Sequence, residues 1–220
     1  MGGTKSRINF NIKLNDEQKD VKSQVLTKPV NFILGNEGTG KTMLGVNIAL
    51  DLFFRKDNNY KQIIITRPTV TTEDFGYLPG NIKEKIAPFL APIYENIRDV
   101  YANNDTKRNK IEKHLEKEDI RILPIAFTRG VTYSDAIVIV DEFQNCNKSQ
   151  IEMIIGRLGK NSKIIFTGSD KQIDLKRKSD SCINLIKKLK DNEYVNIFTL
   201  TINHRNAAVE SILKFIRNEK

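Results

Sequence analysis

The chain has 220 residues, of which 39% are hydrophobic and 29% charged, and this composition is typical of a soluble globular protein long enough to bury a core. No apolar run approaches the ~20 residues that span a membrane, and residues 1–10 lack the apolar centre of a secretory signal, so we expect a cytoplasmic protein without a membrane partner. Cys146 and Cys182 are the only cysteines, which argues against a disulfide framework or a zinc site.

The formal net charge is +9, which is a marked basic excess for this length. Such an excess attracts polyanions, so RNA or single-stranded DNA is the first partner to consider. The alternative is a chain rich in lysine for compositional reasons, with its lysines spread over solvated faces. Charge alone does not decide between the two.

Short apolar, β-branched runs recur along the chain, and stretches with helical spacing lie between them. The runs are continuous rather than alternating, as expected of strands covered on both faces. We predict strands at Val30–Leu34, Gln62–Thr66, Ile120–Pro124, Ala136–Val140, Lys163–Thr167 and Val195–Leu200. We predict helices at Lys41–Phe54, Ile82–Leu90, Pro92–Tyr101, Lys107–Glu116, Lys148–Leu158, Ser181–Lys190 and Ala207–Arg217. This order predicts an α/β domain with a mainly parallel central sheet flanked by helices.

Two stretches interrupt the pattern. Thr66–Gly80 is punctuated by prolines and glycines, which predicts a structured loop. Tyr101–Asp119 is dense in charges of both signs and has only a narrow apolar stripe, which predicts a peripheral helix at the rim of the domain.

A phosphate-loop motif directly follows the first strand. Its glycines let the backbone curl so that N–H groups point at a phosphate. Lys41 would reach the β- and γ-phosphates, and the Thr42 hydroxyl would ligate Mg²⁺. The alternative interpretation is a glycine-rich turn that binds no ligand. It is disfavoured because a predicted strand precedes the motif and a predicted helix follows it. The predicted nucleotide-binding residues are Gly35, Asn36, Glu37, Gly38, Thr39, Gly40, Lys41 and Thr42.

Two carboxylates end the strand at Ala136–Val140. Asp141 would hold the Mg²⁺ shell, and Glu142 would polarise the attacking water. Many buried strands end in an acid, so this pair is informative only together with the phosphate loop. The pair also favours hydrolysis over phosphoryl transfer to a small molecule, because it supplies a base for water.

Polar residues also follow the four other predicted strands. Gly168 to Gln172 follow Lys163–Thr167 and suit a sensor of nucleotide state, with an ordinary turn as the alternative. Arg67, Arg129 and Arg205 come after strands, at the edge where open α/β sheets bind ligands. For any one arginine, surface solvation is as good an explanation as function.

Together these residues resemble the PhoH family in order and spacing. The resemblance rests on Gly35–Thr42, Arg67-Pro68, Gly76–Gly80, Arg129-Gly130, Asp141–Asn145, Thr167-Gly168, Gln172–Leu175 and His204-Arg205. It implies a three-layer, RecA-like domain over residues 14–220, preceded by an N-terminal extension at 1–13. It also implies binding and hydrolysis of ATP with Mg²⁺, and a relation to superfamily 1 helicases.

The same resemblance implies roles for single residues. Gln18, in Leu14–Gln18, would read the adenine edge. Arg67 and Arg129 would contact the nucleic-acid backbone, and Gln172 and Arg205 would take the sensing and arginine-finger positions. Two positions depart from the family. Ser169 stands where the family has aspartate, which bears on the sensor. Phe143 stands where a small residue is usual, which predicts a packing change.

We therefore expect a single RecA-like ATPase that acts on RNA or single-stranded DNA. Translocating motors close the ATP site between two RecA-like units, so we expect a homo-oligomer, by family analogy a hexameric ring, with Arg205 or Arg129 acting across the interface. One alternative is a slow, nucleotide-switched binding protein without motor activity. A second, a small-molecule kinase, is disfavoured by Glu142.

Overall fold

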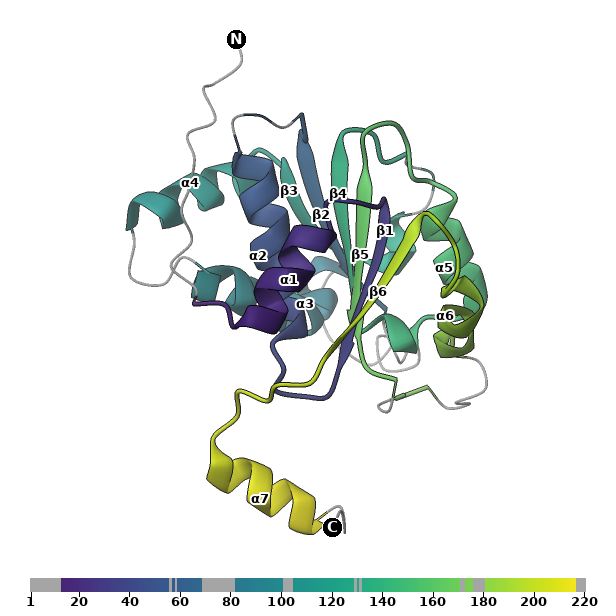
Figure 1. Ribbon diagram of the computed structural model, residues 1–220. Helices are drawn as coiled ribbons and strands as arrows, with labels where there is room; N and C mark the ends of the chain where they lie inside the picture. Colours follow the sequence, from purple (N-terminus) through teal and green to yellow (C-terminus); the bar gives the residue numbers. More distant parts are fainter. Residues whose placement is uncertain are drawn as a thin grey trace.

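The apolar strands build one sheet that helices cover on both faces. The computed structural model describes residues 13–55, 57, 59–68, 82–100, 105–128, 130, 132–170, 173–175 and 181–216, with the backbone alone at 82–89, 210 and 214 (Figure 1). Its six strands are all parallel, in the order β3-β2-β4-β5-β1-β6. They are β1 (Val30–Gly35), β2 (Gln62–Arg67), β3 (Ile120–Pro124), β4 (Ala136–Asp141), β5 (Lys163–Gly168) and β6 (Val195–Leu200).

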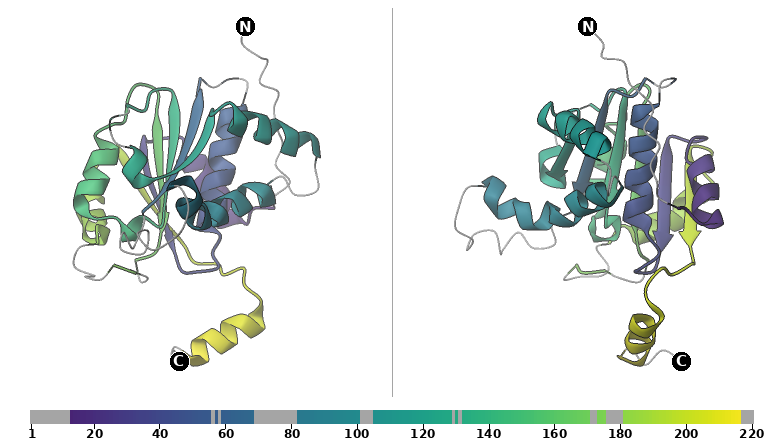
Figure 2. Two further views of the ribbon diagram at one scale, coloured as in Figure 1. Left: turned by 180° about the vertical axis from the view of Figure 1, so that it is seen from behind. Right: turned by 90° about the vertical axis from the view of Figure 1, so that its left-hand side faces the viewer.

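Each strand contributes to two cores, because successive side chains point to opposite faces of a sheet. Ile33 and Ile139 face one layer of helices. Phe32 and Val138 face the other. The first layer holds α1 (Asp16–Gln24), α2 (Lys41–Phe54), α3 (Ile82–Val100) and α4 (Asp105–Glu116). The second holds α5 (Lys148–Ile155) and α6 (Ile183–Leu189), which confirms the predicted three-layer α/β fold (Figure 2).

Three phenylalanines anchor the segment that follows β4. Phe32 stacks on Phe166 with 4.5 Å between ring centroids, and Phe143 meets Phe32 edge-on at 5.3 Å. All three side chains are buried, and burying each one stabilises the fold by about 2–3 kcal/mol relative to exposure. Phe143 begins the 3-10 helix η3 (Phe143–Asn145), so this cluster fixes the chain directly after Glu142.

Parallel pairing brings the carboxyl ends of the central strands to one edge. β1 ends at Gly35, β4 at Asp141 and β5 at Gly168. Asp141 pairs in register with Thr167 on the neighbouring strand. Ligands of open α/β sheets bind at this edge, and the predicted nucleotide-binding motifs meet here.

The strand predictions are confirmed to within one residue, whereas several helix predictions are wrong in part. Ile82–Leu90 and Pro92–Tyr101 are one helix, α3, because Pro92 removes a single N–H while buried Ile93 and Ile97 hold the helix to the core. α5 and α6 are shorter than predicted, and the sequence reading did not include α1 or the 3-10 helix η2 (Ile125–Thr128). The predicted rim helix is α4, with Ile111 buried.

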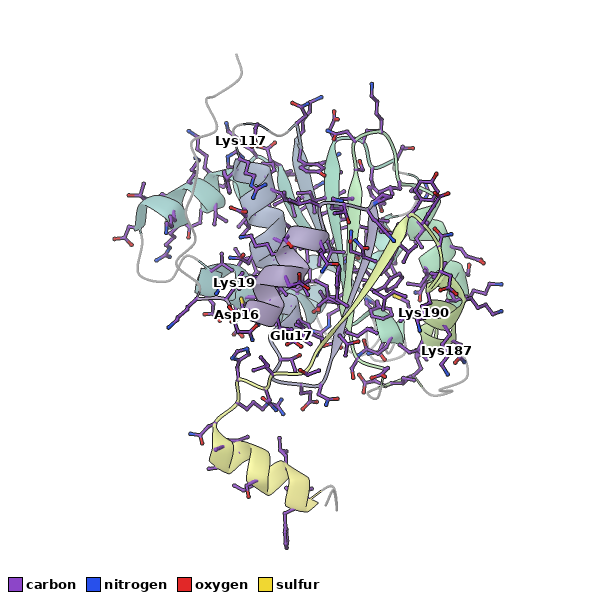
Figure 3. The ribbon with its side chains drawn as sticks, in the orientation of Figure 1. Asp16, Glu17, Lys19, Lys117, Lys187 and Lys190 are labelled. Atoms are coloured by element: carbon purple, nitrogen blue, oxygen red, sulfur yellow. The ribbon has the colours of Figure 1, made fainter. Side chains whose placement is uncertain are left out.

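The chain after β6 returns to α1 before it reaches α7 (Ala207–Ile216). The backbone N–H and the hydroxyl of Thr201 donate to Glu17 Oε1 at 2.8 and 3.0 Å, and Glu17 lies where this segment passes α1 (Figure 3). α7 then lies apart from the sheet and its helices (Figures 1 and 2). Its side chains Ile212 and Phe215 are exposed.

In the described part of the chain, no helix combines the length and the apolar character that crossing a membrane requires. The predicted loop at Thr66–Gly80 lies outside the described residues from position 69 onward, and so does nearly all of the predicted extension at 1–13.

Candidate nucleotide-binding site

The phosphate-loop motif folds as a turn between β1 and α2, which begins at Lys41. Gly40 stands at the N-cap of α2 in a left-handed conformation with φ of 77°, and no side chain caps the helix. Uncapped N–H groups at a helix N-terminus bind anions, because they donate hydrogen bonds and lie at the positive end of the helix dipole. The loop can therefore hold the phosphates of a nucleotide.

Lys41 folds back onto its own loop. Its Nζ donates to the carbonyl oxygen of Asn36 at 2.8 Å. Burial lowers the pKa of Lys41, although the nearby carboxylates of Glu142 and Asp141 oppose this shift. A phosphate that replaced the Asn36 carbonyl would give the ammonium group a charged partner, which is the stronger kind of hydrogen bond.

The segment after β6, Thr201–Asn206, crosses the phosphate loop, and we call it the strap. The His204 N–H donates to the Gly38 carbonyl at 2.9 Å. Arg205 Nη2 lies 2.9 Å from Glu37 Oε2. Gly38 has φ of 82°, and a Cβ at this position would come within 2.7 Å of Arg205 Cγ. Glycine is therefore required where the strap contacts the loop.

Asp141, at the end of β4, is connected to α2 and to β5 through hydroxyl groups. Its Oδ1 accepts hydrogen bonds from Thr42 Oγ1 at 2.7 Å and from Thr167 Oγ1 at 2.8 Å. Mg²⁺ binds proteins through one or two carboxylates and takes further oxygen ligands from phosphates and water. Among the described residues, no group of three or more His, Cys, Asp and Glu side chains could hold a metal. Thr42 and Asp141 are therefore suited to hold an Mg²⁺ whose remaining ligands are oxygen atoms of nucleotide phosphates and water.

Glu142 begins the turn after β4 and faces the loop. It adopts φ of 51°, which costs a residue with a side chain about 1–2 kcal/mol. Gln144 Nε2 donates to Glu142 Oε2 at 2.6 Å, and Arg67 Nη2 lies 3.6 Å from Oε1. Burial and the charge of Asp141 raise the pKa of Glu142, while Gln144 and Arg67 oppose the rise. A carboxylate with raised proton affinity is suited to act as a general base.

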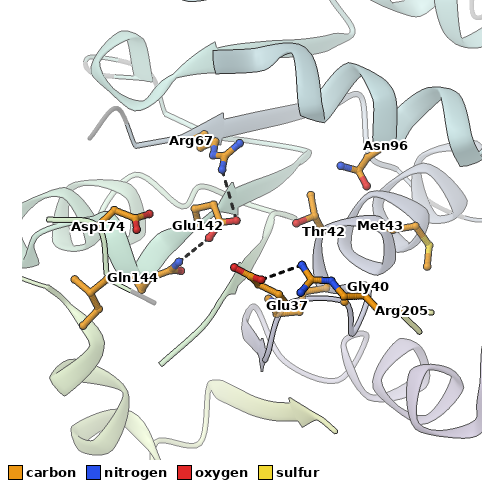
Figure 4. A pocket seen from close by; sticks show the side chains of 13 residues that line it. Glu37, Gly40, Thr42, Met43, Arg67, Asn96, Glu142, Gln144, Asp174 and Arg205 are labelled. Carbon is orange, nitrogen blue, oxygen red and sulfur yellow. Dashed lines mark hydrogen bonds and ion pairs between the residues drawn. The ribbon is translucent and has the colours of Figure 1, made fainter. Parts of the chain in front are cut away.

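These groups surround one pocket at the carboxyl edge of the sheet, with a volume of about 660 Å³ (Figure 4). Of the predicted site residues, the structure brings together in its lining Glu37, Gly38, Gly40, Lys41, Thr42, Arg67, Glu142 and Arg205. Asp141 lies against Thr42, and Thr39 braces the loop through a 2.8 Å hydrogen bond from its hydroxyl to the Asn36 carbonyl. Gly35 belongs to β1.

Gln18 lies beside the loop rather than in the pocket lining. Its side chain is buried on α1, and its Nε2 donates to the Thr39 carbonyl at 3.3 Å. A Cβ placed on Gly40 would lie 3.2 Å from the same nitrogen and 3.4 Å from Met43 Cε. Because Gly40 and Met43 line the pocket, the amide of Gln18 lies directly behind the pocket wall.

The sequence also singled out Arg67, Arg129, Gln172 and Ser169. Arg67, which the resemblance assigns to nucleic-acid contact, lies in the pocket against Glu142. Arg129 and Gln172 lie outside the described residues. Ser169, the departure from the family pattern, is buried, and its backbone N–H donates to Gln144 Oε1 at 3.1 Å. Gln144 therefore connects the end of β5 to Glu142.

Sequence reasoning assigned no role to several residues of the pocket lining, namely Met43, Asn96, Gln144, Ile173 and Asp174. Gln144 stands within the Asp141–Asn145 motif, so its place in the motif is a signal that could have identified it. Asn96 comes from the C-terminal part of α3 and belongs to no motif, and the packing of α3 on α2 brings it to the pocket.

Comparison with known sequences identifies relatives over nearly the whole chain. The profile of the family described as "PhoH-like protein" matches residues 12–217. The PhoH-like protein of Bacillus subtilis (strain 168) is 39% identical over 173 residues, which are 78% of this chain and 52% of the relative. Protein PhoH of Escherichia coli (strain K12) is 34% identical over 188 residues, 83% of this chain and 51% of the relative. The chain thus spans about half the length of these relatives.

Comparison with solved structures shows the fold. The large terminase of a thermophilic bacteriophage superposes with a TM-score of 0.61 at 11% identity, over 92% of this chain and 50% of the terminase. The same terminase in complex with ADP gives 0.54, with the same identity and coverage. At this level of identity the likeness establishes the architecture alone.

Proposed function

The chain belongs to the PhoH family, and on that premise we propose that it binds ATP together with Mg²⁺ and hydrolyses it. The observation that carries this proposal is the 2.7 Å hydrogen bond between Thr42 Oγ1 and Asp141 Oδ1, with Glu142 as the next residue. This contact joins the phosphate loop to the carboxylate pair across 99 positions of sequence separation. This contact supports the proposal because the proposed metal ligands, Thr42 and Asp141, and the candidate base then lie beside the same helix N-terminus.

Each group has a distinct task in the proposed reaction. The N–H groups at the start of α2 and the ammonium of Lys41 hold the β- and γ-phosphates. Thr42 and Asp141 would hold Mg²⁺, which would supply positive charge to neutralise those phosphates. Glu142 orients a water molecule and takes its proton. Arg205, which lines the pocket, can stabilise charge on the transferring phosphoryl group once it leaves Glu37.

The proposal extends to a polymer partner and to assembly. A net charge of +9 favours binding of RNA or single-stranded DNA, and such binding weakens as salt rises because counterions are released. We further propose a homo-oligomer, by family analogy a hexameric ring, in which hydrolysis is coupled to the bound strand.

A second candidate is a slow nucleotide switch that binds partners without motor activity. It is favoured by the contacts of Glu142, whose carboxylate accepts a hydrogen bond from Gln144 and lies near Arg67, so that protein groups engage the candidate base. The serine at position 169 adds to this, since the family has aspartate there.

The test is the steady-state rate of phosphate release from ATP with Mg²⁺, with and without single-stranded RNA or DNA. The motor proposal expects strong stimulation by polymer. Glu142→Gln should abolish turnover and keep ATP binding, and Lys41→Ala should weaken binding. Turnover in Lys41→Ala at the wild-type rate would refute the ATPase. Nucleotide binding with negligible turnover that polymer does not change would identify the switch.

A further inference from the structure

A second pocket lies between α5 and α6, on the face of the sheet opposite α2. Its volume is about 460 Å³, and among the described residues it shares no lining residue with the nucleotide pocket. We call it the lysine pocket, and its polar lining residues are Asn147, Lys148, Ser149, Ser181, Asn184 and Lys188. The described part of its lining contains two ammonium groups and no carboxylate, so the pocket is positively charged.

The donors in the lysine pocket suit a phosphate group. Lys148 and Lys188 provide ammonium groups from two different helices, and Ser149 adds a hydroxyl. Asn147 adds a further donor, because its Oδ1 already accepts from the Gln150 N–H at 2.9 Å and its Nδ2 can only donate. Lysine, serine and asparagine side chains are common partners of nucleic-acid phosphates.

The surroundings of the pocket favour a nucleic-acid strand over a single free phosphate. Lys187 and Lys190 continue the positive charge along α6 outside the pocket (Figure 3). Successive phosphates of a strand can contact this row, whereas a free phosphate contacts the pocket alone. Lys148 Nζ lies 3.5 Å from Glu152 Oε1, but both side chains are largely exposed, so this ion pair contributes little and a phosphate can replace Glu152. No described lining residue is aromatic, so the pocket binds phosphate rather than a stacked base.

Hydrogen bonds connect the lysine pocket to the turn that carries Glu142. Asn147 and Ser181 form an antiparallel β-bridge, and Ser181 Oγ donates to the Gln144 carbonyl at 2.5 Å. Gln144 Nε2 in turn donates to Glu142 Oε2 at 2.6 Å. Two hydrogen bonds therefore lead from a residue of this pocket to the candidate base.

We propose that the lysine pocket binds a phosphate group of an RNA or single-stranded DNA strand, and that Ser181 connects the bound strand to Glu142. This rests on the proposed function and assigns its polymer partner a binding site. A strand phosphate held between Lys148 and Lys188 fixes α5 against α6. Ser181, directly before α6, then holds Gln144 and with it the carboxylate of Glu142, so strand binding raises the rate of hydrolysis.

The first test is the affinity for a labelled oligouridine, measured by fluorescence anisotropy at several salt concentrations. The double variant Lys148→Gln, Lys188→Gln should bind about 10-fold more weakly. Its slope of log affinity against log salt should become shallower by about 0.7–1.4, which corresponds to one or two lost phosphate contacts.

The matched control is the double variant Lys113→Gln, Lys117→Gln. It removes the same charge at the end of α4, in the other helix layer and away from α6 (Figure 3). Affinity and salt slope should stay at the wild-type values. Equal losses in the two double variants would show a general effect of charge and would overturn the proposal.

Inorganic phosphate distinguishes the two sources of the phosphate group. The backbone NMR signal of Ser149 should shift when oligouridine is added, and inorganic phosphate at the same concentration of phosphate groups should shift it less. If inorganic phosphate shifts Ser149 as far as oligouridine does, the pocket is a site for free phosphate and the proposal is wrong.

The second test treats Ser181 as a positioning residue. Ser181→Ala removes the hydroxyl that holds the Gln144 carbonyl, so the stimulation of kcat by saturating oligouridine should fall by about 3- to 10-fold. The KM for ATP and the Kd for oligouridine should stay at their wild-type values, a split that a merely structural role would not produce. Full stimulation in Ser181→Ala would overturn the connection to Glu142.

The outcomes separate this proposal from the proposed function. If the wild type hydrolyses ATP but binds no oligouridine, the polymer partner and the lysine pocket are both wrong and the ATPase stands. If oligouridine binds to wild type and to Lys148→Gln, Lys188→Gln with equal affinity and salt slope, the strand binds elsewhere and only the role of the pocket fails. If the wild type binds neither ATP nor oligouridine, the proposed function itself is wrong.

Discussion

At the scale of single residues, Glu142 shows how the site sets the proton affinity of its candidate base. Burial and Asp141 raise the pKa of Glu142, and the charge of Arg67 limits the rise. The base is active as the carboxylate, so the rate should fall as pH drops through this raised pKa, above the value near 4.3 of an unperturbed glutamate. Arg67→Gln removes the positive charge and should move this acid limb to still higher pH.

The measurement is kcat for ATP hydrolysis as a function of pH in wild type and Arg67→Gln. Arg55→Gln is the charge-matched control, because Arg55 pairs with Asp51 at the far end of α2 and does not line the pocket. Acid limbs that coincide in wild type and Arg67→Gln would show that Arg67 does not act on Glu142.

Asp141 supports a second residue-scale prediction, on stability. Thr167 Oγ1 donates to the buried Asp141 carboxylate at 2.8 Å, and Thr167→Val removes this bond at nearly constant volume. A hydrogen bond to a charged group contributes about 1.5–3 kcal/mol, so the free energy of unfolding in urea should fall by about that amount. Thr66→Val is the control, because Thr66 Oγ1 is buried on β2 without a hydrogen-bond partner among the described residues. That change should be neutral or stabilising, and an equal loss in both variants would contradict the role of the bond.

The residues of the site differed in how far the sequence could predict them. Gly38, Lys41 and Glu142 belong to local motifs whose spacing is set by a loop or by a strand end, so they could be predicted before any fold was known. The pairing of Arg205 with Glu37 and of Arg67 with Glu142 depends on side-chain directions across separate strands. No sequence spacing specifies such directions.

At the scale of elements, strands were easier to predict than helices. A buried parallel strand is a continuous β-branched run, and its ends are marked by polar residues. α1 has only Val21 as a buried apolar side chain within its bounds, so its periodicity is weak. Its capping box, formed by Asn15 and Gln18, was the local signal available. α3 continues through Pro92 because tertiary packing compensates for one lost hydrogen bond, which sequence propensity does not capture.

The first residue of β5 gives a prediction about the pH dependence of stability. Lys163 is buried, its Nζ donates to the carbonyls of Leu26 and Lys28, and burial lowers its pKa to about 8. The unfolded chain has the ordinary lysine value of ~10.4, so between about pH 8 and 10.4 the unfolded state binds more protons. Stability should therefore rise with pH in this window, by about 1–2 kcal/mol once solvent screening is allowed for.

The readout is the free energy of unfolding in urea at several pH values from 7 to 10, in wild type and in Lys163→Met. Other lysines and tyrosines titrate in both proteins, so the difference between the two curves isolates position 163. This difference should change between pH 8 and 10 and stay constant below pH 8. A difference that is constant over the whole range would mean that Lys163 titrates as an ordinary lysine.

At the scale of the whole molecule, one RecA-like sheet supplies the phosphate loop, the carboxylate pair and Arg205 from a single chain. Arg205 lines its own pocket, 2.9 Å from Glu37 of the same phosphate loop. An arginine finger that acts on the site of its own chain does not require a neighbouring subunit. Closure of the ATP site between two RecA-like units does require one. Assembly and the action of Arg205 are therefore separable questions.

For assembly, we expect light scattering after size-exclusion chromatography to find an oligomer, a hexamer by family analogy, when Glu142→Gln protein is saturated with ATP. That variant is the suitable sample because it should hold ATP without consuming it. Monomer alone under these conditions would refute the oligomer.

For Arg205, a subunit-mixing experiment decides between action within a chain and action across an interface. Lys41→Ala subunits carry an intact Arg205 but a defective phosphate loop, and Arg205→Ala subunits carry the reverse. Because Arg205 faces its own loop, we expect a mixture of the two to remain as inactive as each alone. Recovered hydrolysis in the mixture would show that Arg205 reaches the site of a neighbour. The same mixing with Arg129→Ala tests the other candidate, since recovery there would assign the action across the interface to Arg129.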